Sequence, residues 1–119
     1  MPLTHDFKET IRARAQRDAA FRQALLCEGV ESILNGDLEA GKAVLRDYVN
    51  ATVGFQDLEK RTRIPAKSLM RMLSPKGSPS AANLTNILTA VQKAEGVHFE
   101  LAFKTTSRRW TQTNADKTS

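Results

Sequence analysis

Residues 55–73 read Phe55-Gln-Asp-Leu-Glu-Lys-Arg-Thr-Arg-Ile-Pro-Ala-Lys-Ser-Leu-Met-Arg-Met-Leu73, and this segment says most about the structure. Arg63-Ile64-Pro65 interrupts it, because proline lacks a backbone N–H and disfavours helix at the residue before it. We therefore predict two short helices joined by a tight turn over residues 55–74. In a helix-turn-helix unit, such helices pack through a few apolar positions at fixed offsets. Those offsets are filled here by Leu58, Ile64, Leu69, Met72 and Leu73.

The second of these helices is expected to present its other face to solvent. That face would carry Ala66, Lys67, Ser68, Met70 and Arg71. A single helix fits the major groove of DNA, with its N-terminal residues near the base edges. Arg71 is suited to bidentate contact with guanine, Lys67 to guanine or phosphate, and Ser68 to contacts of either kind. The sequence therefore predicts a recognition helix.

Further predicted DNA contacts flank this helix. Gln56, at the start of the first helix, is placed to bind a backbone phosphate together with the free amides of that helix. Lys76 and the serines Ser78 and Ser80 lie in or beside the loop that follows the second helix, where they would hold neighbouring phosphates. The predicted DNA-binding residues are Gln56, Lys67, Ser68, Arg71, Lys76 and Ser78.

The positive charge is concentrated around this segment. The chain of 119 residues has a net charge of +5, and residues 51–80 hold six Lys and Arg against two Asp and Glu. Residues 1–50 and 81–103 each carry −1, and residues 104–119 carry +3. A localised basic segment is typical of a surface that binds a polyanion. The alternative is a solvated basic face, or an ordinary helical hairpin, without a partner.

The rest of the chain predicts a compact all-α protein. We divide it into an N-terminal helical segment (residues 1–17), a helical domain (residues 18–103) and a basic flexible tail (residues 104–119). A helix break is expected near Asp18, a helix end at Asn35-Gly36, and another end at Gly96. Asp37 and Ser80 are placed to cap the helices that follow them. The sequence Pro75-Lys-Gly-Ser-Pro79 predicts a loop.

Residues 97–103 alternate apolar and polar side chains, which predicts one short β-strand. A lone strand needs a partner, and we expect it to pair with a second copy of the chain, another protein or a short unrecognised segment. The pairing of two copies would give a homodimer. In the tail, Arg108-Arg109-Trp110 suggests an arm for DNA or a protein partner, or an inert extension.

One part of the sequence also resembles a known family. The pattern Val53-Gly-Phe55, Leu58, Ser68-Leu69, Arg71-Met-Leu-Ser74, Gly77-Ser-Pro79, Asn83-Leu84 and Ile87-Leu88 is similar to the HigA-like antitoxins, a branch of the Xre-type helix-turn-helix regulators. The resemblance covers roughly residues 18–103. It implies a small dimeric repressor that binds double-stranded DNA, and for some relatives an antitoxin that neutralises a RelE/HigB-type ribonuclease toxin.

Three positions depart from the common pattern of this unit and family. Glu59 stands where Ala or Gly is usual after Leu58, and Arg63 stands where the turn often has Gly. Ser78 replaces an Asn that family members usually carry between the Gly and the Pro of the loop. Its short hydrogen-bonding side chain is expected to preserve that loop.

Composition disfavours an enzyme, and no cofactor is expected. The two histidines, His5 and His98, have no companions at metal-ligand spacing. The single cysteine, Cys27, sits among apolar residues and is interpreted as a small core or semi-core residue and not as a reactive thiol. The absence of a second cysteine suggests a reducing compartment. With no apolar run of membrane-spanning length and no signal-peptide pattern, we expect a cytoplasmic protein that does not enter membranes. A helical oligomerisation module without a DNA role is the third hypothesis.

Overall fold

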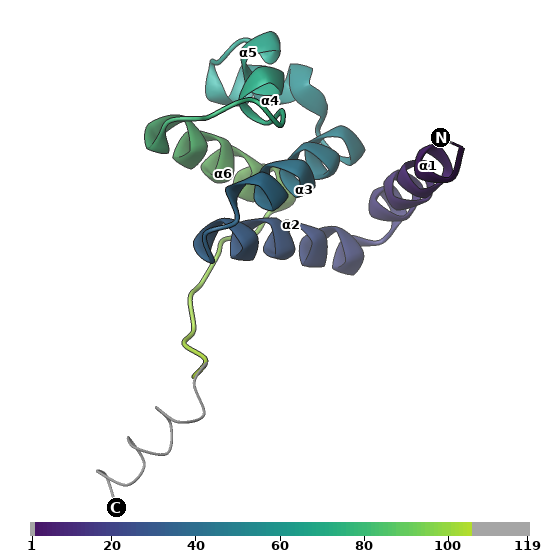
Figure 1. The fold of residues 1–119 in the computed structure, drawn as a ribbon, viewed down its shortest axis with the longest axis horizontal. Coiled ribbons are helices and arrows are strands. Elements are labelled where there is room, and N and C mark those ends of the chain that lie inside the picture. Colours follow the sequence, from purple (N-terminus) through teal and green to yellow (C-terminus); the bar gives the residue numbers. More distant parts are fainter. Residues whose placement is uncertain (1, 106–119) are drawn as a thin grey trace, which may run out of the picture.

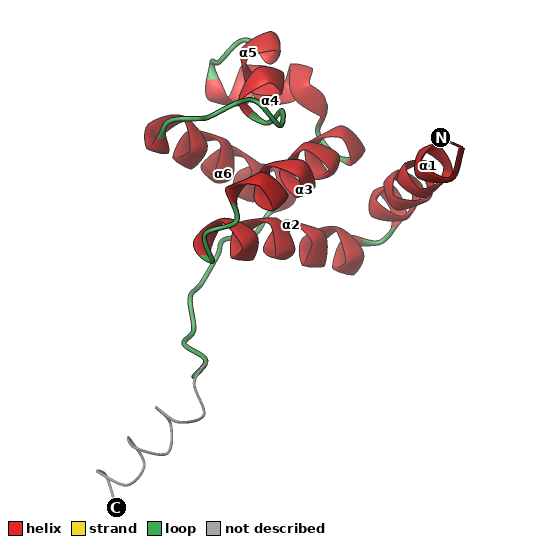
Figure 2. Cartoon of the chain, in the orientation of Figure 1, coloured by secondary structure: helices red, strands yellow, loops and turns green. Residues whose placement is uncertain are grey.

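Six α-helices follow one another in the computed structural model, which describes the backbone of residues 2–105 and the side chains from residue 10 onward (Figure 1). They are α1 (Pro2–Arg17), α2 (Ala19–Leu34), α3 (Leu38–Ala51), α4 (Gly54–Thr62), α5 (Ala66–Met72) and α6 (Ala81–Glu95). The residues between 2 and 105 contain no strand (Figure 2). The predicted all-helical class is confirmed for this part of the chain.

Side-chain caps fix where several helices begin. Asp18, Asp37 and Ser80 each accept a hydrogen bond at 3.1 Å from the backbone N–H three residues later. These bonds satisfy amides that have no partner within the first helical turn. Beyond the end of α2, Gly36 has a φ of +92°, a left-handed conformation that glycine adopts without a Cβ clash. The predicted break at Asp18 and the caps at Asp37 and Ser80 are thus confirmed.

The helices pack around one core that reaches from α2 to α6. Helix α2 lies along α3, α1 contacts both, and α4 contacts α3, α5 and α6. In Figure 1, α4 and α5 lie at the top of the helical part, α2 lies at its bottom, and α1 lies to the right. Within this contiguous core, the residues of at most 1% exposure are Leu26, Leu45, Tyr48, Val49, Leu58, Leu69, Leu73, Ile87 and Val91. Helices α4 and α5 are therefore continuous with the main core.

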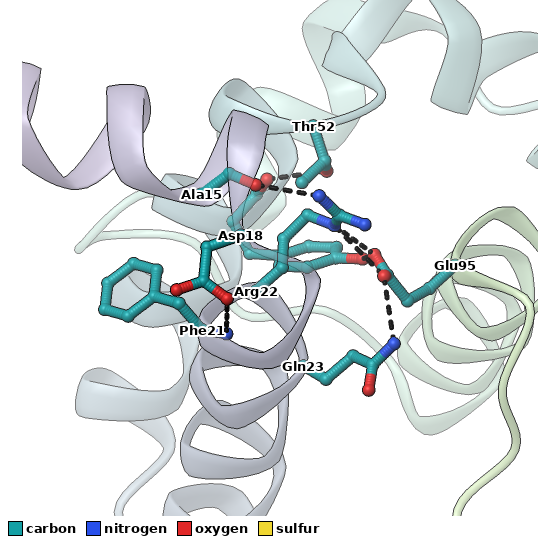
Figure 3. A network of polar contacts seen from close by, with 8 residues as sticks. Ala15, Asp18, Phe21, Arg22, Gln23, Thr52 and Glu95 are labelled. Carbon is teal, nitrogen blue, oxygen red and sulfur yellow. Dashed lines mark hydrogen bonds and ion pairs between the residues drawn. The ribbon is translucent and has the colours of Figure 1, made fainter.

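A polar network joins the helices away from the α4–α5 end (Figure 3). Arg22 in α2 donates from Nε to both carboxylate oxygens of Glu95 at 3.0 Å, and from Nη1 to the carbonyl of Ala15 at 2.9 Å. The hydroxyl of Tyr48 donates a short hydrogen bond to Glu95, and Gln23 donates to the same carboxylate at 3.4 Å. The network ties α1, α2, α3 and α6 together.

The Glu95 carboxylate is held in its charged form by this network. Burial alone would raise the pKa of Glu95, but hydrogen bonds from Tyr48, Arg22 and Gln23 outweigh it and lower the pKa below its usual value. Burial, followed by the hydrogen bond to Glu95, raises the pKa of the Tyr48 hydroxyl. Tyr48 is therefore a neutral donor and Glu95 a charged acceptor.

The predicted strand is not found. Residues 97–105 form a loop that leaves the helical core, with Val97 and Phe99 half-buried, Leu101 84% exposed and Phe103 fully exposed. A strand needs a neighbour to bond its backbone, and the described part of a single chain offers none. The pairing of residues 97–103 with a second copy of the chain stays a prediction. Most of the predicted tail, including Arg108-Arg109-Trp110, lies outside the described residues.

The interpretation of Cys27 as a core residue was wrong, because this side chain is exposed. Leu26 and Gly29 are the buried residues of α2, on the face that meets α3. With 3.6 residues per turn, Cys27 lies about 100° around the helix from Leu26, on the same outer side as Gln23 and Glu31.

Candidate nucleic-acid interface

Helix α4 is anchored on one side and exposed on the other. Phe55, Leu58 and Thr62 are buried, and they lie at positions i, i+3 and i+7 of the same face. Gln56, in the first turn, is exposed, as predicted for a residue that would meet a phosphate. The last turn of α4 exposes Lys60 and Arg61.

Hydrogen bonds from within the domain hold the turn that follows α4. The backbone N–H of Arg63 donates to the carbonyl of Glu59 at 2.7 Å, and that of Ile64 to the Thr62 hydroxyl at 3.2 Å. From α6, the Asn86 amide donates to the carbonyl of Thr62 at 3.1 Å. Arg63 adopts a left-handed conformation with φ of 65°, which is uncommon outside glycine. These bonds set the direction in which α5 leaves the turn.

Glu59 supplies the cap of α5 from the preceding helix. Its Oε1 accepts a hydrogen bond at 2.8 Å from the backbone N–H of Ala66, the first residue of α5. Pro65, the residue before α5, makes no side-chain cap bond. A carboxylate at a helix N-terminus is stabilised by the free amides and by the helix dipole. The departure from Ala or Gly at position 59 therefore has a structural purpose that the sequence analysis missed.

Helix α5 rests on Ala66, Leu69 and Leu73. Leu58, Leu69 and Leu73 are buried as predicted, and Ile64 and Met72 pack against the same core. The prediction that Ala66 faces solvent was wrong, since it is only 6% exposed. Ala66 precedes Leu69 by three residues and Leu73 by seven, and so shares their face.

The predicted recognition residues lie together on the outside of α5. Lys67 and Arg71 are exposed, and Ser68 is half-buried. Arg71 donates from Nη2 to the Ser68 hydroxyl at 3.4 Å, which holds the guanidinium along the helix surface. Met70 shares this surface at 44% exposure. The outer side of α5 thus carries the charged groups of Lys67 and Arg71, the hydroxyl of Ser68 and the apolar side chain of Met70.

The loop between α5 and α6 exposes Lys76 and Ser78 and is held from beneath by α3. Lys42 is 1% exposed, and its Nζ donates to the carbonyls of Pro75 at 3.3 Å and Gly77 at 2.5 Å. One turn later, Arg46 donates to the carbonyl of Leu73 at 3.0 Å. The role of Lys42 and Arg46 in holding this loop is not predicted from the sequence.

The charge of residues 51–80 is arranged to face outward. All six basic residues of this range are exposed, namely Lys60, Arg61, Arg63, Lys67, Arg71 and Lys76. The two acidic residues are used within the fold: Asp57 pairs with Arg61 at 3.2 Å, and Glu59 caps α5. These six exposed residues lie on α4, the turn after it, α5 and the following loop, and we call them together the basic surface.

No family model, curated protein or solved structure matches this chain. The resemblance to HigA-like antitoxins therefore stays a prediction.

Two further findings, on membrane spans and on metal sites, concern the described residues alone. None of the helices in residues 2–105 is both long and apolar enough to cross a membrane. No group of three or more His, Cys, Asp and Glu side chains within that range is arranged to hold a metal ion.

Proposed function

We propose that this chain is a sequence-specific DNA-binding regulator in which α4 and α5 form a helix-turn-helix unit and α5 enters the major groove. The observation that carries the proposal is the orientation of α5. Leu69 and Leu73 are buried beneath the helix, while Lys67 and Arg71 are exposed on its outer side within the basic surface. Side chains held on a rigid helix are suited to reading base edges. The resemblance to HigA-like repressors suggests the same role.

Within this proposal the contacts divide into two kinds. Arg71, Lys67 and Ser68 would read bases, with Arg71 bidentate to guanine. Gln56, Lys76 and Ser78 would hold phosphates on either side, which fixes the register of the protein without reading sequence. Lys60, Arg61 and Arg63 would add long-range attraction to the DNA backbone.

The test begins with the selection of bound oligonucleotides from a random pool at a stated salt concentration. On the selected site, Arg71→Ala should weaken binding by about 1–3 kcal/mol and relax the base preference at one position. Lys93→Ala removes an exposed positive charge from α6, outside the basic surface, and should leave affinity unchanged. Unchanged affinity of the Arg71 variant would refute the recognition-helix assignment. Failure to bind any DNA at physiological salt would favour a helical oligomerisation module.

We further propose that the protein acts as a homodimer. Helix-turn-helix proteins generally bind two half-sites, so that a two-fold axis in the protein matches one in the DNA. The side chains of Leu101 and Phe103 are exposed, and they lie in the part of residues 97–105 that follows the last backbone bond to α6, from Phe99 to the Gln92 side chain. Double-stranded DNA and a second copy are thus the proposed partners.

A second candidate function, the neutralisation of a RelE/HigB-type toxin, is favoured by an open cleft of about 440 Å³ along α2. Phe21, Leu25, Cys27, Glu28 and Glu31 are among its lining residues. A ribonuclease must attract RNA, so its surface is basic, and the two glutamates would complement it. Co-expression with a toxin encoded beside the gene tests this. The complex should survive Arg71→Ala and be weakened by Glu28→Lys, a charge reversal at an exposed residue of the cleft.

A further inference from the structure

Lys42 is the most deeply buried charged side chain of the described residues, and it lies directly beneath the loop that carries Lys76 and Ser78. An ammonium group has three hydrogens to donate. Here Nζ donates to the carbonyls of Pro75 and Gly77, and the ammonium also forms an ion pair with the Glu39 carboxylate at 3.4 Å. A buried charge is tolerated only when it is paired and bonded in this way. The burial of this charge beneath the loop therefore indicates that Lys42 has a role in holding the loop.

The carbonyls held by α3 belong to alternate residues. Arg46 binds that of Leu73, and Lys42 binds those of Pro75 and Gly77. A carbonyl oxygen directed at a phosphate would repel it, because the partial negative charge of the oxygen would face the negative charge of the phosphate. The two cations keep these oxygens on the inner side of the loop. The intervening residue, Lys76, extends its side chain into solvent.

The loop can follow this path only because residue 77 is glycine. A Cβ at this position would lie 1.9 Å from the carbonyl oxygen of Arg71 and 2.7 Å from that of Met72. The last turn of the recognition helix, the loop and Lys42 are therefore in direct mutual contact.

We propose that Lys42, with Arg46, is a positioning residue for DNA binding: it holds the loop after the recognition helix so that Lys76 and Ser78 meet a backbone phosphate. This inference rests on the proposed function. Lys42 itself does not touch DNA. Its effect on affinity should run through Lys76 and should leave base reading by Arg71 intact.

The experiment measures affinity for the selected site against salt concentration for wild type, Lys42→Met, Lys76→Ala and the double variant. Both single variants should bind roughly fivefold more weakly. Both should also lower the slope of log K against log salt by about 0.9 for each protomer bound, because one phosphate contact is lost. In the Lys42→Met background, Lys76→Ala should have no additional effect, and the base preference should be that of wild type.

Two further variants complete the experiment, one as a control and one as a substitute for Lys42→Met. Glu39→Gln removes the exposed ion partner and leaves both loop bonds, so it should bind DNA as wild type does. Should Lys42→Met fail to fold, Arg46→Gln tests the same loop by cutting the bond to Leu73. In folded Lys42→Met or in Arg46→Gln, amide exchange should accelerate at Ser74 and residues 76–78 and not in α6, whereas Glu39→Gln should exchange as wild type does.

Additive effects of Lys42→Met and Lys76→Ala, or an unchanged salt slope with Lys42→Met, would overturn the proposal. Either result can be told apart from failure of the proposed function, in which wild type itself binds no selected site.

Discussion

The Glu59 carboxylate, in the second turn of α4, accepts a hydrogen bond at 2.8 Å from the backbone N–H of Ala66, the first residue of α5. One side chain therefore links the two helices of the proposed DNA-binding unit. The intervening turn contains Arg63 in a left-handed conformation. The cap offsets part of the conformational cost of that turn, which is of order 1–2 kcal/mol for a residue with a Cβ.

Removing this cap should destabilise the domain. Glu59→Ala should lower the free energy of unfolding by about 1 kcal/mol, because the first amide of α5 loses its acceptor. Glu59→Gln keeps an acceptor oxygen and should lose less. Glu31→Ala, at an exposed position of α2, is the matched control and should not destabilise. Urea denaturation measures all three, and equal stability of wild type and Glu59→Ala would contradict the cap.

The stability of the protein should fall in acid through Glu95. The pKa of Glu95 is lowered in the fold, whereas an unfolded Glu titrates near about 4.3. The contribution of its charged form is therefore complete above the unfolded pKa and is lost as the pH falls through the folded pKa. Glu95→Gln should reduce the free energy of unfolding by about 2 kcal/mol at pH 7.

The difference between wild type and Glu95→Gln isolates this group, since other carboxylates titrate in both proteins. Urea denaturation at several pH values should show the difference shrinking below about pH 4.3. A difference that stays constant from neutral to acid pH would mean that Tyr48 and Arg22 do not hold the charged carboxylate.

Gly77 should tolerate no side chain. The Cβ of Gly77→Ala would lie far inside contact distance of the Arg71 and Met72 carbonyls, so the backbone must move. Overpacking of this kind is expected to destabilise by about 1–3 kcal/mol. Gly36→Asn is a suitable control, because Gly36 has open space around it and Asn tolerates a left-handed conformation. Thermal unfolding should show a clear loss for Gly77→Ala and a smaller one for Gly36→Asn.

Features that depend on neighbours in the sequence could be predicted. The caps at Asp37 and Ser80 and the buried positions Leu58 and Leu69 follow from spacing within one helical turn or across one tight turn. Local geometry sets such features almost independently of the rest of the chain. The error at Ala66 is also local, because a small side chain at the start of a helix fits either face.

Contacts between residues that lie far apart in the sequence could not be predicted. Lys42 meets its acceptors 33 and 35 residues away, and Arg22 meets Glu95 across 73 residues. In the sequence these are ordinary helix charges, and only the packing of α3 under the loop and of α2 beside α6 brings them to their partners. Residues 97–103 alternate apolar and polar side chains, but the structure places them in a loop, and their pairing as a strand stays a prediction.

The homodimer proposal predicts that Leu101 is essential for association. In an antiparallel pair centred on Leu101, the two Leu101 side chains would meet, and Phe99 would lie opposite Phe103 of the partner subunit. Centring the pair on Glu100 would instead place two carboxylates directly opposite each other, which is destabilising. The Leu101-centred register is therefore preferred.

Light scattering at tens of micromolar should give a dimer for wild type and a monomer for Leu101→Asp. The variant would bury a charge in the interface and weaken association more than tenfold. It should fold normally, because Leu101 is 84% exposed in the single chain. Ala102→Ser, on the alternate face, is the control and should remain dimeric. A monomeric wild type, or a Leu101→Asp protein that still dimerises, would show that this segment does not join two copies.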